Sequence, residues 1–145
     1  MDIRVEVIRE TNQELVDAFN RLLPQLSSAA EPLGFEAVDR VVTCDANTVL
    51  VARTPDAIVG TLTVVLLPLS SGLRARVEDV VVDSVARGQG VAGLLTRQAL
   101  RIAQEAGART VDLTSRPDRA AANRLYQRHG FKARQSTVYR FVIDG

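Results

Sequence analysis

The stretch ARGQGVAGLL, residues 86–95, restricts the possible folds of this chain more than any other segment. It places Gly88, Gly90 and Gly93 directly before an apolar stripe at helical spacing, and an apolar strand pattern at residues 73–83 precedes it. Three glycines at a helix start cost stability relative to alanine, so a benefit should offset that cost. When a strand, a glycine turn and a helix follow one another, the free N–H groups at the helix start bind an anion, usually phosphate. The sequence therefore predicts a phosphate-binding turn rather than a simple tight turn.

The residues before this turn alternate between strand and helix patterns. They predict a strand at 3–8, a helix beginning at the capping box TNQE (11–14), an ambiguous stretch at 27–45 interpreted as a short second helix, and a hairpin of strands at 47–54 and 57–67. The strand at 73–83 follows directly. Because three strands then succeed one another without a helix, we expect this part of the sheet to be antiparallel.

The residues after the turn predict two helices and two strands. The first helix runs from Gly90 to Gly107 and leads into a strand at 108–115, and this order implies a parallel right-handed crossover. Asp118 is expected to cap the second helix, and Gly130 to stop it with Phe131 folded back on it. A last strand, TVYRFVID, closes the chain. The whole pattern predicts one α+β domain over residues 1–145, with a mixed sheet of six or seven strands and about four helices.

Composition and charge exclude several classes of function. The formal net charge is +1 at pH 7, which gives no reason to expect nucleic acid as a partner. One cysteine, Cys44, and one histidine, His129, cannot form a zinc cluster, and we expect no metal site. The longest apolar run, residues 57–69, is shorter than the roughly 20 residues of a membrane helix, and the first residues do not resemble a signal peptide. We therefore expect a cytoplasmic protein with a free thiol and no membrane partner.

Two protein families that bind a phosphate-containing cofactor at a glycine turn fit this sequence. GQGVAG matches the dinucleotide fingerprint GxGxxG, but that fold places the motif after its first strand and needs several more crossover units. The longer stretch VEDVVVDSVARGQGVAGLL resembles the GNAT superfamily of acetyl-CoA-dependent N-acetyltransferases, because Arg87, Gly90 and Ala92 match its signature. NRLYQRHGF, residues 123–131, is similar to the same family's helix with a tyrosine followed by glycine and an aromatic residue. The order of elements agrees over nearly the whole chain, so we favour this family over the dinucleotide folds.

The resemblance implies a binding mode for acetyl-CoA. In this family the strand before the turn splays from its parallel neighbour, and the pantetheine arm of the cofactor fills the gap. The main-chain groups of Val80, Val81 and Val82 would pair with that arm. The pyrophosphate would lie on the N–H groups of the turn, which comprises Arg87, Gly88, Gln89, Gly90, Val91, Ala92 and Gly93. Arg119 stands where many relatives carry a cofactor-binding asparagine, and Asn123 is expected to take over that role.

The resemblance also implies catalytic residues. Tyr126 matches the family position that gives a proton to the departing thiolate, although a tyrosine packed in the core is the structural alternative. Glu78 and Asp79 are adjacent carboxylates in a strand, and regular alternation would send them to opposite faces. We prefer Glu78 as the base, acting through water, with Asp79 as second choice. A backbone N–H near Val82 would stabilise the oxyanion.

The acceptor is expected to be the primary amine of a small molecule. The strand before the turn looks most like the glucosamine-phosphate N-acetyltransferase branch, whereas residues 113–131 follow the general superfamily pattern. An enzyme that acetylates a protein lysine or an N-terminal amine is the alternative, and a module that binds acetyl-CoA without turnover is another. A homodimer is left open.

Overall fold

The computed structural model describes residues 2–143 and divides into two compact units, Met1–Thr114 and Ser115–Gly145. The first unit holds the whole sheet. The second holds the last helix and the segment that follows it.

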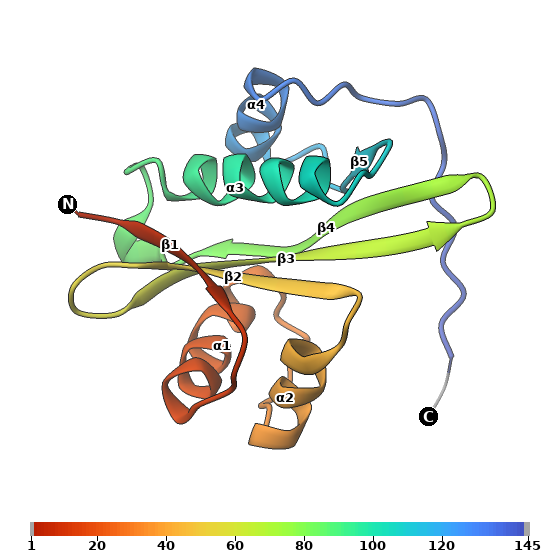
Figure 1. Ribbon diagram of the computed structural model, residues 1–145. Coiled ribbons are helices and arrows are strands. Elements are labelled where there is room, and N and C mark those ends of the chain that lie inside the picture. The colour runs from red at the N-terminus through yellow and green to blue at the C-terminus, as the bar shows by residue number, and fades with distance from the viewer. Residues whose placement is uncertain (1, 144–145) are drawn as a thin grey trace. The chain divides into compact units, whose positions relative to one another are not determined.

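The first unit is a five-stranded sheet with helices on both faces (Figure 1). The strands lie in the order of the chain: β1 (Arg4–Ile8), β2 (Asn47–Arg53), β3 (Ile58–Leu69), β4 (Gly72–Val82) and β5 (Val111–Asp112). Neighbours from β1 to β4 are antiparallel, and β5 is parallel to β4, which confirms the predicted hairpin and the parallel crossover. Within residues 2–143 the sheet has five strands, fewer than the six or seven that the sequence predicts.

Three helices of the first unit cover this sheet. α1 (Gln13–Leu26) and α2 (Phe35–Thr43) cover one face, and α3 (Val91–Glu105) covers the other (Figure 1). The ambiguous stretch at 27–45 does contain a short helix, as predicted. Two apolar clusters result, one on each face, with Leu22 at the centre of the first and Leu50 in the second, both fully buried. Truncating a buried leucine of this kind to alanine typically costs about 2–5 kcal/mol.

The start of α1 differs from the prediction by one residue. Asn12 is the cap, and its side chain accepts a hydrogen bond from the Leu15 N–H at 2.9 Å. The predicted cap, Thr11, instead donates its hydroxyl to the Asp39 carboxylate at 2.8 Å and so joins α1 to α2. Asparagine and threonine are both good caps, and here the tertiary bond to α2 uses the threonine.

A bulge interrupts β4 at the predicted carboxylate pair. Thr63 pairs with Glu78 and Thr61 with Val81, so β4 carries one residue more than β3 between these two pairs. Asp79 lies in this bulge with φ at 54°, a left-handed conformation that aspartate tolerates better than most residues. The assumption of regular alternation through Glu78 and Asp79 was therefore wrong.

The strand β5 is much shorter than predicted. Only Val111 and Asp112 pair with β4, opposite Ala75 and Arg76, although the sequence predicts a strand over 108–115. Within the described residues, β4 from Val77 onward consequently has a strand partner on its β3 side alone. The two parallel strands separate there.

The second unit consists of α4 (Ala120–Arg128) and the residues on either side of it. Arg119, not the predicted Asp118, stands at the cap position. The helix stops as expected: Gly130 has φ at 97°, and the Phe131 N–H donates to the Tyr126 carbonyl at 3.0 Å. The rings of Tyr126 and Phe131 meet edge to face with centroids 5.8 Å apart.

The predicted last strand is wrong for the residues that the structure describes. Residues 137–143 form no strand, and the predicted end at Asp144 lies outside the described residues. The large apolar side chains of this segment are 70–90% exposed: Val138, Tyr139, Phe141, Val142 and Ile143. Alternation favours a strand only where another strand supplies backbone partners, and none of the described residues pairs with this segment.

Candidate active site

The glycine turn leads from β4 into α3 through two left-handed residues. Gly88 and Gly90 both have φ at 79°, and Gly90 is the N-cap of α3 without a side-chain hydrogen bond. A Cβ built at either position would meet no atom within 4 Å. Glycine is therefore required here by backbone conformation and not by crowding within the chain.

The N–H groups of the turn and of the first residues of α3, from Arg87 to Gly93, have no backbone acceptor among the described residues. Among the described residues, the first N–H of α3 that donates to a backbone carbonyl is that of Leu94, which binds Gly90 at 3.2 Å. Free N–H groups and the positive end of the helix dipole together favour an anion at this position. The residues from Arg87 to Gly90 are exposed, whereas Ala92 and Gly93 are half-buried.

Asp83 fixes the chain just before the turn. It is 8% exposed and accepts hydrogen bonds from the Val85 N–H and from Arg21 Nε, each at 3.3 Å. Burial opposes ionisation of Asp83, but the hydrogen bonds that it accepts outweigh burial and lower the pKa of this carboxyl. Sequence reasoning missed this residue, although an aspartate between a strand and Ser84 is a typical turn signal.

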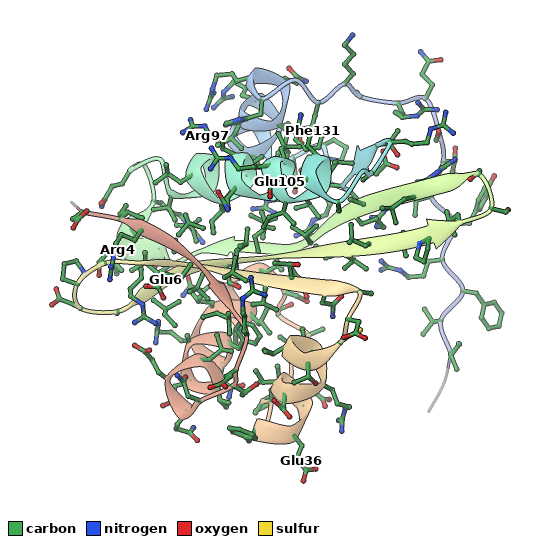
Figure 2. All side chains as sticks on the ribbon, in the orientation of Figure 1. Arg4, Glu6, Glu36, Arg97, Glu105 and Phe131 are labelled. Atoms are coloured by element: carbon green, nitrogen blue, oxygen red, sulfur yellow. The ribbon has the colours of Figure 1, made fainter. Side chains whose placement is uncertain are left out.

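Two strand segments of the sheet have a partner on one side alone among the described residues, the edge strand β1 and the part of β4 beyond β5, and they differ in charge. On β1, Arg4 and Glu6, both labelled in Figure 2, form an ion pair at 3.7 Å. Arg53 of β2 approaches Glu6 at 3.4 Å. Such charges discourage another strand from pairing. The β4 edge at residues 80–82 carries three valines and no such charges. An extended ligand with amide groups could pair there as a strand does.

The predicted carboxylates lie in different surroundings. Glu78 Oε2 is 2.9 Å from Arg76 Nε, so a guanidinium already holds this carboxylate. Asp79 lies at the surface of the bulge, where partial desolvation and the neighbouring Glu78 charge raise the pKa of its carboxyl. No side chain among the described residues forms an ion pair with Asp79, and the raised pKa of its carboxyl favours acceptance of a proton.

The predicted proton donor and the predicted cofactor asparagine lie in the second unit. Tyr126 is 9% exposed; burial raises the pKa of its hydroxyl, and the Arg119 charge lowers it by less. The hydroxyl thus keeps its proton at neutral pH. Asn123 donates its side-chain amide to the Arg116 carbonyl at 3.1 Å, so its nitrogen already has a partner in the chain.

Comparison with known proteins decides the family. The model of the Acetyltransferase (GNAT) family matches residues 12–131, most of the chain. The chain belongs to the GNAT acetyltransferase family. The matched range includes the glycine turn and Tyr126, and membership makes this chain an acyltransferase of a family that uses acetyl-CoA.

Relatives of this GNAT acetyltransferase have diverse names. N-alpha-acetyltransferase 30 of Schizosaccharomyces pombe is 33% identical over 73 residues, which span 50% of this chain and 48% of that protein. A Bacillus halodurans structure described as a transcriptional regulator has a TM-score of 0.79 at 28% identity, covering 96% of this chain and all of that one. An aminoglycoside acetyltransferase from an uncultured soil metagenomic sample has a TM-score of 0.86 at 19% identity, covering 99% and 97%.

Two further observations concern the described residues of this GNAT acetyltransferase. None of their helices combines the length and the apolar character needed to cross a membrane. No three His, Cys, Asp or Glu side chains among them gather closely enough to hold a metal ion.

Proposed function

We propose that this GNAT acetyltransferase transfers the acetyl group of acetyl-CoA to the primary amine of a small molecule. The observation that carries the proposal is the form of β4, which is bulged at Asp79, has no strand partner on one side from Val77 onward among the described residues, and ends four residues before the glycine turn. A free strand edge and an anion-binding helix start then follow each other along one segment of chain.

This segment fits the two chemically different parts of acetyl-CoA. The main chain of Val80, Val81 and Val82 offers hydrogen bonds to the amides of the pantetheine arm, in the manner of an added strand. The N–H groups between Arg87 and Gly93 offer donors to the pyrophosphate. Because a Cβ built on either glycine at φ 79° would meet no atom within 4 Å, the space beside the backbone is open and phosphate oxygens can reach it.

The reaction needs a neutral amine, a stabilised oxyanion and a proton for the leaving group. The amine nitrogen attacks the acetyl carbon; a C–N bond forms, the C–S bond breaks, and the sulfur takes a proton. We assign removal of the amine proton to Asp79 ahead of Glu78, since Arg76 already holds Glu78. A main-chain N–H near Val82 stabilises the oxyanion, and Tyr126 donates the proton to sulfur.

Two classes of acceptor have support from different relatives. The name of the aminoglycoside acetyltransferase from soil supports a small-molecule amine, through likeness of fold. The partial match to N-alpha-acetyltransferase 30 supports the second candidate, an N-terminal amine of a peptide. We further propose a cytoplasmic location, because the free thiol of Cys44 suits a reducing compartment.

A thiol-release assay tests the proposal. The purified chain is incubated with acetyl-CoA and a library of aminosugars, polyamines, amino acids and short peptides, and free CoA thiol is measured against reactions without an amine. We expect release with at least one small-molecule amine. Release with peptides alone favours the second candidate. No release with any amine, together with bound CoA in native mass spectrometry, identifies a binding module without turnover and contradicts the proposal.

A further inference from the structure

The second unit carries a cation at the start of α4, where a cation is unfavourable. Arg119 occupies the N-cap position, and the first turn of α4 contains no acidic residue. The positive end of a helix dipole repels a guanidinium, and arginine cannot cap the free N–H groups. Among the described residues, no carboxylate forms an ion pair with Arg119 that would offset this cost.

The backbone of Arg119 is held firmly at this place. Its N–H donates to the Arg116 carbonyl at 3.1 Å, and its carbonyl accepts the Asn123 N–H at 3.0 Å. The Asn123 side chain adds a hydrogen bond to the Arg116 carbonyl. One hydrogen bond thus closes the turn from Arg116 to Arg119, and two from Asn123 attach it to α4, so the backbone position of Arg119 is fixed.

Arg119 is the N-cap of α4, and Tyr126 lies within the helix seven positions further on. Seven positions are about two helical turns and about 10 Å along the axis, a spacing that brings two residues to the same side of a helix. Side chains on a helix tilt toward its N-terminus, which favours a Tyr126 side chain that leans toward the Arg119 end of α4. Phe131, which packs edge to face on the Tyr126 ring, is uncharged. Burial raises the pKa of the Tyr126 hydroxyl, and the positive charge of Arg119 lowers it by less.

We propose that Arg119 is a positioning residue for proton donation by Tyr126, its guanidinium stabilising the negative charge that remains on the phenolic oxygen when the proton leaves for the sulfur. The proposal rests on the proposed function. The C–S bond breaks, sulfur receives the Tyr126 proton, and the phenolate oxygen takes a proton back from solvent before the next turnover. Burial makes such a charge costly, and Arg119 is the cation placed to offset it.

An absorbance titration tests the electrostatic part without any substrate. The chain has two tyrosines, so Tyr139→Phe leaves Tyr126 as the only phenol that ionises at alkaline pH. In this background we expect Arg119→Gln to move the Tyr126 midpoint upward and Arg119→Lys to restore most of the difference. Arg124→Gln removes the same charge from α4. Because Arg124 lies about 200° around the helix from Tyr126, we expect this variant to leave the Tyr126 midpoint unchanged. Equal midpoints for Arg119→Gln and its background overturn the proposal.

Kinetics separate this inference from the proposed function. With the best amine, Arg119→Gln should lose kcat on the order of tenfold near neutral pH and keep its KM for acetyl-CoA, and the alkaline limb of its pH profile should move as the titration does. A raised KM with unchanged kcat would make Arg119 a cofactor contact and contradict the positioning role. If the unaltered chain acetylates no amine, the proposed function fails, while the titration still decides the relation of Arg119 to Tyr126.

Discussion

The two ends of α3 both depend on a glycine in the left-handed region, but they use it differently. At the C-terminal end, Gly107 has φ at 84°, its N–H donates to the Gln104 carbonyl at 3.1 Å, and the Ala108 N–H donates to the Ala103 carbonyl at 3.0 Å. At the N-terminal end, Gly90 has nearly the same φ, yet the N–H groups around it have no described acceptor before Leu94.

This difference distinguishes a glycine kept for the fold from one kept for a ligand. The turn at Gly107 completes the hydrogen bonding of the helix, so its whole benefit is internal. The turn at Gly90 leaves donors exposed at the positive end of the helix dipole, and its benefit comes only when an anion binds. The same backbone conformation therefore has two uses, and the hydrogen bonds around it tell them apart.

A third glycine beside α3 should give the largest loss of stability when it is changed. A Cβ on Gly60 would stand 3.1 Å from Val91 Cγ1 and 3.3 Å from the Val81 carbonyl, because α3 packs directly on β3 there. We expect Gly60→Ala to cost about 1 kcal/mol and Gly60→Val about 3 kcal/mol of unfolding free energy. Urea denaturation measures both. A loss for Gly60→Val no larger than that for Gly107→Val would contradict the distinction between crowding and conformation.

Asp83, which holds the chain before the glycine turn at the start of α3, should give the next largest loss of stability when it is changed. Asp83→Asn keeps the shape but weakens the bonds to Arg21 and to the Val85 N–H, and we expect a loss of about 1–3 kcal/mol at pH 7. Because the folded pKa of Asp83 is lowered, its contribution is present above the unfolded value of about 4 and is lost as pH falls through the folded one. Denaturation curves of both proteins should therefore converge in acid. A difference in unfolding free energy between the two proteins that stays constant with pH would exclude the Asp83 charge as its source.

Substitution of Asp79 in the bulge should change the free energy of unfolding least, and should raise it where the other substitutions lower it. The pKa of Asp79 is raised in the folded chain, so ionisation above the unfolded value of about 4 destabilises the fold. Asparagine removes that charge and also tolerates the left-handed region. We expect Asp79→Asn to be slightly more stable than the unaltered chain at pH 7, with the gain vanishing in acid, and to be less active if Asp79 is the base.

Alanine at the same position is the matched control for conformation. It also lacks the charge but disfavours φ at 54°, which costs about 1–2 kcal/mol. Asp79→Ala should thus be less stable than Asp79→Asn in the same thermal scans. An Asp79→Asn protein that is less stable than the unaltered chain at pH 7 would show that the Asp79 charge helps the fold.

The sequence predicted an element correctly where the residues that end it, or the strand that pairs with it, are close by in the sequence. The hairpin at Pro55 and Asp56, the end of α3 at Gly107 and the end of α4 at Gly130 were all confirmed. The last strand was wrong because alternation in TVYRFVID describes what a strand buries but not which backbone it pairs with. The predicted strand at 108–115 was too long for the same reason.

The candidate site was predictable in its turn but not in its carboxylates. The glycine spacing was enough to place free N–H groups at the start of α3, because the turn and the helix are neighbours in sequence. The bulge at Asp79 depends on pairing with β3, and the ion pair between Arg76 and Glu78 depends on rotamers, so alternation could not foresee either. The Glu78 preference from the sequence stays a prediction that the free Asp79 carboxylate now challenges.

Calorimetry of acetyl-CoA binding to Gly90→Val and Gly107→Val tests the central claim most directly. Both substitutions force a valine into φ near 80° with no atom within 4 Å of the new Cβ, so each should cost about 1–2 kcal/mol and leave the chain folded. We predict that Gly90→Val weakens acetyl-CoA binding on the order of 100-fold, because the donors of the turn move and the Cβ blocks the phosphates, and that Gly107→Val leaves affinity unchanged. Equal affinities in the two variants would contradict the assignment of the glycine turn to the cofactor.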